Sequence, residues 1–171
     1  MTSPHAIAPA RADDLGAVAA LLTAAALPLA GVDAQFPVGY VVATRAGVVV
    51  GAAGLEIHGA AGVLRSVVVA PGARGRGLGQ ALSADRVAAA RAGGLAAVYL
   101  LTTTAADFYW RLGFAPCARA EVPAAIAGSI EFASVCPASA ACLRLDLRAT
   151  PDDPLRPFGA VPVSQPGGSD D

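Results

Sequence analysis

The 171-residue sequence contains no lysine, so all 12 of its basic residues are arginines. This absence excludes a Walker-type nucleotide-binding loop, because that loop ends in a lysine followed by serine or threonine. The arginines are scattered along the chain, and the formal net charge is only −1. A dispersed and nearly balanced charge argues against a nucleic-acid surface, so we expect no nucleic-acid partner.

Cysteine is also scarce. The chain has three, Cys117, Cys136 and Cys142, and we expect no export signal before them. An odd set of this kind favours a reducing compartment over a disulfide framework, so we expect a cytoplasmic protein. Soft metals usually need tighter cysteine pairs or a third ligand, so we expect no metal and interpret Cys136 and Cys142 as buried structural residues.

Long apolar runs are missing. The hydrophobic fraction of 55% overstates the apolar character of the chain, because much of that fraction is alanine. The longest uncharged run, residues 15–32, is broken by Pro28 and preceded by two aspartates instead of a cationic segment. A membrane span needs about 20 consecutive apolar residues. We therefore expect neither a spanning helix nor a signal peptide, and no membrane partner.

The first part of the sequence predicts an antiparallel run of strands. Four apolar segments separated by turns predict these strands: 5–9, 39–44, 48–58 and 63–70. Asp13 or Asp14 is expected to cap a helix that continues to about Ala26.

The second part changes to strand–helix–strand order. It predicts helices at 77–91 and 105–112 and strands at 96–103 and 142–147. Between them, the segment 114–122 is loosely strand-like and 123–137 predicts short helical turns. Because a long helix precedes it, the strand at 96–103 should lie parallel to the strand at 63–70. Residues 149–171 have a composition typical of a disordered tail, which leaves one α/β domain over residues 1–148.

A glycine-rich loop between the strand at 63–70 and the helix at 77–91 predicts an anion site. Its glycines allow the backbone to approach a phosphate at the positive end of a helix, and its arginines add charge. A dinucleotide fingerprint would need a third glycine where Gln80 stands. The alternative is a tight turn without a ligand. The loop consists of Arg74, Gly75, Arg76, Gly77, Leu78 and Gly79.

This loop fits the pattern R-x-x-G-x-G, and its surroundings carry L-R-S-V-V-V-A-P, V-Y-L-L-T-T-T and A-A-D-F-Y-W-R-L-G-F. With these motifs, residues 64–114 resemble the GNAT superfamily of acetyl-coenzyme A-dependent N-acetyltransferases. The resemblance implies a single-domain GNAT fold with a mixed, mostly antiparallel sheet and flanking helices. It also implies that the sheet splays between the strands at 63–70 and 96–103, and that acetyl-CoA is the co-substrate.

The resemblance further implies which residues contact the coenzyme. The backbone of Val67, Val68 and Val69 would pair with the pantetheine arm as an added strand, and a nearby N–H could stabilise the oxyanion. The loop from Arg74 to Gln80 would hold the pyrophosphate. Thr102 lies where the family often has an asparagine, so its coenzyme-binding role is left open.

A narrower resemblance rests on T-T-T-A, F-Y-x-x-L-G-F, V-P-A-A-I and E-F-A-S-V-C-P-A-S-A. These runs resemble the small acetyltransferases associated with bacterial arsenic-resistance operons. The resemblance implies a small amino-acid-like amine as substrate, with an arsenical amino acid as one candidate. A homodimer is left open.

Three residues are candidates for chemistry on the substrate. Tyr109 lies where the family commonly has the general acid, although a tyrosine packed in the core is the alternative. Glu56 stands in an otherwise apolar strand and could accept the amine proton through water, with His58 as a rival base. Its alternative is a charge at an exposed strand end.

Arg65 is the candidate for binding a substrate carboxylate, because a guanidinium forms bidentate contacts with such a group. The alternative is a strand charge paired with Glu56 or Asp146. We therefore expect an N-acetyltransferase that acts on small amines. A non-catalytic acyl-CoA-binding or sensing domain is the alternative, and such a domain would need neither Tyr109 nor Glu56.

Overall fold

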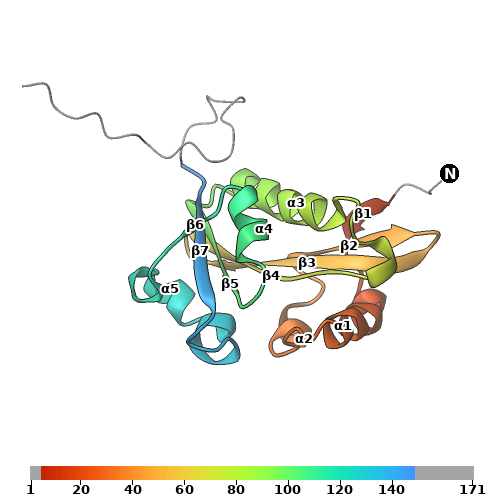
Figure 1. The fold of residues 1–171 in the computed structure, drawn as a ribbon, viewed down its shortest axis with the longest axis horizontal. Helices are drawn as coiled ribbons and strands as arrows, with labels where there is room; N and C mark the ends of the chain where they lie inside the picture. Colours follow the sequence, from red (N-terminus) through yellow and green to blue (C-terminus); the bar gives the residue numbers. More distant parts are fainter. Residues whose placement is uncertain (1–4, 149–171) are drawn as a thin grey trace, which may run out of the picture.

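A computed structural model describes residues 5–148, which form one seven-stranded sheet with helices on both faces (Figure 1). The strands lie in the order β1-β2-β3-β4-β5-β7-β6. Their bounds are β1 Ala6–Pro9, β2 Tyr40–Arg45, β3 Val48–His58, β4 Ala61–Val69, β5 Ala97–Thr102, β6 Ala115–Pro116 and β7 Ala141–Asp146. Only β4 and β5 pair in parallel, so the predicted mixed and mostly antiparallel sheet is confirmed.

In the described part of the chain, five α-helices flank this sheet, with α1 and α2 on one face and α3 and α4 on the other (Figure 1). They are α1 Leu15–Ala24, α2 Val32–Gln35, α3 Leu78–Ala92, α4 Ala106–Arg111 and α5 Ala124–Ala127. Turns of 3₁₀-helix lie at Ala12–Asp14, Pro71–Ala73 and Arg119–Glu121, and a π-helical turn lies at Glu131–Val135. No helix in residues 5–148 is long and apolar enough to cross a membrane.

The alternation of side chains along β2 explains why both faces are covered. Tyr40 and Val42 pack against α1 in one buried cluster, whereas Val41 and Ala43 pack against α3 in another. Successive strand residues point to opposite faces, so a strand with apolar residues at every position needs a helix on each side.

The sheet opens between β4 and β5. Their parallel pairing covers only Ala61–Val63 with Ala97–Tyr99, and the two strands separate beyond these residues. A β-bulge lies just after this point, because Ser66 has a φ of 55° and the register of β4 against β3 shifts by one residue. A bulge bends its strand and increases the local twist. The predicted splay is therefore confirmed.

Three local predictions differ from the structure. Asp14 does not cap α1 with its side chain, because its carboxylate accepts a hydrogen bond from the backbone N–H of Arg11, and α1 ends at Ala24. The loosely strand-like segment at 114–122 pairs with β7 over two residues only and then forms a 3₁₀ turn. Helix α2 was not predicted. The predicted tail at 149–171 lies outside the described residues.

Candidate active site

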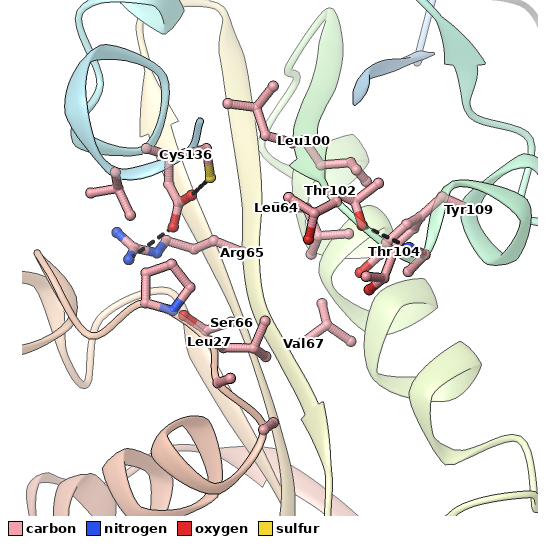
Figure 2. A pocket seen from close by; sticks show the side chains of 18 of the residues that line it. Leu27, Leu64, Arg65, Ser66, Val67, Leu100, Thr102, Thr104, Tyr109 and Cys136 are labelled. Carbon is pink, nitrogen blue, oxygen red and sulfur yellow. Dashed lines mark hydrogen bonds and ion pairs between the residues drawn. The ribbon is translucent and has the colours of Figure 1, made fainter. Parts of the chain in front are cut away.

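A pocket of about 370 Å³ occupies the gap between the separated ends of β4 and β5 (Figure 2). Residues Leu64–Val67 of β4 line one part of it, and Leu100–Ala105 line another. The loop at 25–28, which follows α1, and the segment around the π-helical turn contribute further lining residues. The pocket therefore depends on the splay, because no backbone hydrogen bonds close the sheet at this point.

The glycine-rich loop lies at the N-terminus of α3, as predicted. Gly77 is the N-cap of α3 with a φ of 75°, and Gly75 has a φ of 74°. The backbone N–H groups of residues 77–80 donate to no acceptor in residues 5–148. Helix N-termini with free N–H groups attract anions, and a Cβ added at Gly75 or Gly77 would meet open space. The loop residues present therefore fit a pyrophosphate.

The side chains of this loop have separate tasks. The guanidinium of Arg74 donates to the carbonyl of Val69 at 2.8 Å, which ties the loop to the end of β4. Arg76 and Gln80 are exposed. Leu78 is buried in the core cluster with Leu82, so only its backbone is available to a ligand.

The β5-facing edge of β4 has no strand partner beyond Val63, although the opposite edge pairs with β3 as far as Val69. Val67 lines the pocket, Val68 packs against α1, and Val69 is half-buried. An extended ligand could therefore add to the backbone of 67–69 as a further strand would.

Tyr109 lines the pocket from α4, and its side chain is largely buried. Its ring packs edge-on against Phe108 and Phe114, with centroids 4.9 and 5.7 Å away. Burial raises the pKa of Tyr109 to about 12. Its hydroxyl makes no hydrogen bond to any residue in the described part of the chain. The phenol is therefore a protonated donor beside the pocket.

Thr102 ends β5 and also lines the pocket. Its hydroxyl oxygen accepts the backbone N–H of Ala105 at 3.0 Å, which shapes the turn into α4. The hydroxyl proton is not used in that bond, so Thr102 can still donate to a ligand.

Arg65 lies on the other side of the pocket, where its buried side chain forms the centre of an ionic cluster (Figure 2). One terminal nitrogen, Nη1, donates to Glu56 at 2.6 Å, and Nη2 donates to the carbonyl of Ala30 at 2.7 Å and forms an ion pair with Glu131 at 3.0 Å. The Nε of Arg65 is buried without a partner in the described residues. A substrate carboxylate would therefore have to compete for Nη1 or Nη2, or reach Nε.

Glu56 is buried beneath Arg65 and does not line the pocket. Its second oxygen lies 3.2 Å from Nε2 of His58. The pairing of Glu56 with Arg65 is one of the alternatives that the sequence offered for Arg65. The alternative offered for Glu56 itself, a charge at an exposed strand end, is wrong because Glu56 is buried. Any influence of Glu56 on the pocket passes through Arg65.

Two further residues line the pocket: Glu131, for which the sequence predicted no role, and Cys136, for which it predicted only a structural one. The thiol of Cys136 donates to Oε2 of Glu131 at 3.0 Å, while Oε1 faces Arg65. Both residues occur in E-F-A-S-V-C-P-A-S-A, but that run has no periodicity that would place it beside β4. A π-helical turn, a feature often found at functional sites, brings them there.

The cysteines do not form one cluster. Cys142 is buried on β7 with its sulfur 2.8 Å from that of Cys117, and both are free thiols. Cys136 is only partly buried, contrary to the expectation that it is a buried structural residue, and it borders the pocket. Within residues 5–148, no group of three His, Cys, Asp or Glu side chains could hold a metal ion.

Comparisons with known proteins agree with this geometry. Residues 37–116 match a family model described as an acetyltransferase (GNAT) domain. A search of curated proteins finds no match. Rv2747 from Mycobacterium tuberculosis, solved in complex with CoA and NLQ, is 25% identical with a TM-score of 0.72, and the match covers 82% of this chain and 98% of that one.

Two further structures share the fold at lower identity. N-acetylglutamate synthase from Neisseria gonorrhoeae, solved with coenzyme A and L-arginine, is 20% identical with a TM-score of 0.71. That match covers 85% of this chain but only 34% of the synthase, so this chain spans about a third of its length. A GNAT-family acetyltransferase from Staphylococcus aureus is 12% identical with a TM-score of 0.69, over 85% of this chain and all of the other.

Proposed function

We propose, on the premise that this chain has the fold of a GNAT acetyltransferase domain, that it transfers an acetyl group from acetyl-CoA to the primary amine of a small amino-acid-like molecule. One observation carries the proposal. The pocket between the splayed ends of β4 and β5 adjoins the open edge of β4, and the unpaired N–H groups of α3 follow where that strand ends. A thioester, its pantetheine arm and its pyrophosphate fit this succession of sites.

In the proposed reaction the amine nitrogen attacks the thioester carbonyl, the C–N bond forms and the C–S bond breaks. Tyr109 donates its phenolic proton to the departing thiolate, and its raised pKa keeps that proton in place over the working pH range. An N–H on the open edge of β4 stabilises the oxyanion. The walls of the pocket hold the two reactants together, which removes much of the entropic barrier.

On the acceptor side, we propose that Arg65 interacts with the carboxylate of the substrate. Glu56 would then assist proton removal by holding Arg65 in place, because its carboxylate is buried behind the guanidinium. The complexes of N-acetylglutamate synthase with L-arginine or N-acetyl-glutamate support small amino-acid ligands for this fold. A link to arsenic resistance rests on the sequence motifs alone.

Release of free thiol from acetyl-CoA across a panel of amines tests this function. The panel should contain glutamate and its analogues, arsenical amino acids and each compound's decarboxylated counterpart. We expect thiol release with at least one small amine and faster release with the carboxylated member of a pair. Tight binding of acetyl-CoA without thiol release for any amine would favour the alternative, a non-catalytic acyl-CoA-binding or sensing domain.

A further inference from the structure

We infer that Glu131 is the group that receives the acceptor amine: its carboxylate binds the substrate's ammonium and takes up the proton that the amine must lose. This inference rests on the proposed function and adds a cation subsite to it. The subsite consists of Glu131, with Cys136 and Arg65 orienting it.

Position is the first argument. Of the described residues that line the pocket, Glu131 is the only carboxylate. It contacts Arg65 and Cys136, which lie across the pocket from Tyr109 and Thr102 (Figure 2). The amine attacks the carbonyl carbon of the thioester, whereas the proton donor has to reach the sulfur bonded to that carbon. The carboxylate and the phenol are therefore on the two sides where the reaction takes up and delivers protons.

The ion pair and the hydrogen bond of the Glu131 carboxylate are the second argument. Arg65 holds Oε1 at 3.0 Å, which fixes the orientation of the carboxylate. Within residues 5–148, Oε2 accepts only the thiol of Cys136, and a thiol is a weak donor. An ammonium N–H forms a stronger, charge-assisted bond, so it can replace the thiol at Oε2. Burial and the neighbouring carboxylate raise the pKa of Cys136 to about 12, which keeps the thiol neutral and prevents it from competing for the acetyl group.

The charge of the surrounding cluster is the third argument. One guanidinium, Arg65, faces two buried carboxylates, Glu56 and Glu131. The buried negative charge exceeds the positive charge by one when His58 is neutral, and a buried unpaired charge is costly. A substrate ammonium beside Glu131 gives the second buried carboxylate a positive partner of its own. The titratable or charged groups around Glu131 and its direct partners are Arg65, Glu56, His58, Tyr40, Cys136 and Arg119.

The chemistry balances without a further reactant. The ammonium transfers one proton to Glu131, and the freed lone pair attacks the carbonyl carbon. The new amide nitrogen retains one hydrogen and loses another to solvent through the pocket, while Tyr109 supplies the proton for the thiolate. Both side chains return to their starting states by exchange with water.

The test is the pH dependence of kcat/KM for Glu131→Gln, measured with the best amine of the panel. Glutamine keeps the shape of the side chain and loses only its charge and basicity. We expect kcat/KM to fall by roughly 10² at pH 7 and the deficit to shrink tenfold per pH unit until the amine is itself deprotonated. Affinity for acetyl-CoA, measured by calorimetry, should not change.

Matched variants complete the experiment. Glu121→Gln makes the same change at an exposed site and should match the wild type. Glu131→Asp should retain the wild-type pH profile at a reduced rate, because it keeps a carboxylate. A Glu131→Gln enzyme with the wild-type profile, or with an equal loss at every pH, would overturn the inference while leaving the proposed function intact. A wild type that acetylates no amine would overturn both.

Discussion

The two sides of the pocket are built in different ways. The proposed coenzyme side comes mainly from one continuous stretch, residues 63–80, which contributes backbone: an open strand edge, a bulge and the N-terminus of α3. Tyr109 of α4 adds a side chain from outside that stretch. The acceptor side consists of three charged side chains, Glu56, Arg65 and Glu131, and the backbone carbonyl of Ala30. The first should therefore tolerate most side-chain changes other than at Tyr109, whereas the second should depend on each of its charged partners.

Tyr109→Phe is expected to have the largest effect, because it removes the one side chain on which the coenzyme side depends for chemistry. The rate constant in single-turnover experiments should fall by about 10²–10⁴, with substrate binding nearly intact. Phenylalanine preserves the packing against Phe108 and Phe114. Since the pKa of Tyr109 is about 12, wild-type activity should show no loss near pH 10 from its ionisation. A normal rate in the variant would indicate protonation by water.

Arg65→Met tests the dependence of the acceptor side on its central charge. The change leaves Glu56 and Glu131 buried without a counter-ion, and breaking a buried pair costs about 3–5 kcal/mol. Urea unfolding should show this loss in the free energy of unfolding. Adding Glu56→Gln to Arg65→Met should recover part of it, because one uncompensated carboxylate is then removed. A loss below about 1 kcal/mol would mean that water already screens the cluster.

Gly79→Ala tests the backbone character of the coenzyme side. A Cβ at Gly79 meets its nearest neighbour, Phe108, at an ordinary 3.6 Å, so the fold should survive. Replacing a helical glycine with alanine stabilises a helix by up to about 1 kcal/mol. The new methyl group should nevertheless hinder the approach of the pyrophosphate and weaken acetyl-CoA binding about tenfold, a change of about 1.4 kcal/mol measurable by calorimetry.

Gly16→Ala is the matched control, because Gly16 is the second residue of α1 as Gly79 is of α3, and a Cβ there meets nothing within 4 Å. It should raise stability without changing affinity. Equal acetyl-CoA affinities for Gly79→Ala and Gly16→Ala would mean that the loop does not bind the coenzyme.

Glu56→Gln tests whether Glu56, which is buried behind Arg65, matters less for the reaction than Glu131, which lines the pocket. Because Glu56 contacts Arg65 and His58 but not the pocket, we expect a loss of only a few-fold in rate, mainly at low pH. Side-by-side pH–rate profiles of Glu56→Gln and Glu131→Gln provide the measurement. A larger effect of Glu56→Gln would make Glu56 the principal proton acceptor, and an unaltered profile would reduce it to a structural role.

Removal of residues 149–171 is expected to have the smallest effect. Their sequence lacks the apolar periodicity that would offset the entropy of ordering them. A chain ending at Arg148 should keep its melting temperature within a few degrees and its activity. A large loss of either would mean that this segment contributes to one side of the pocket or to a partner subunit.

The coenzyme side was accessible from the sequence because its determinants are local. The turn residues Gly75 and Gly77, the helix that follows them and the parallel strand beyond it all leave patterns within a short stretch of chain. The structure confirms these elements to within one or two residues. Short elements without such patterns were missed, as with α2, or overextended, as with the segment at 114–122.

By itself, then, the sequence predicted most of the elements in their order and located the glycine-rich loop, and the family resemblance implied the splay. The tertiary structure alone decided that Glu56 is buried behind Arg65 and that Glu131 and Cys136 border the pocket. The physical reason is the distance over which each interaction acts. Turn and helix preferences act between neighbouring residues. Arg65 contacts Ala30 and Glu131, which lie far from it in the sequence, and these contacts require the sheet and the π-helical turn to be in place.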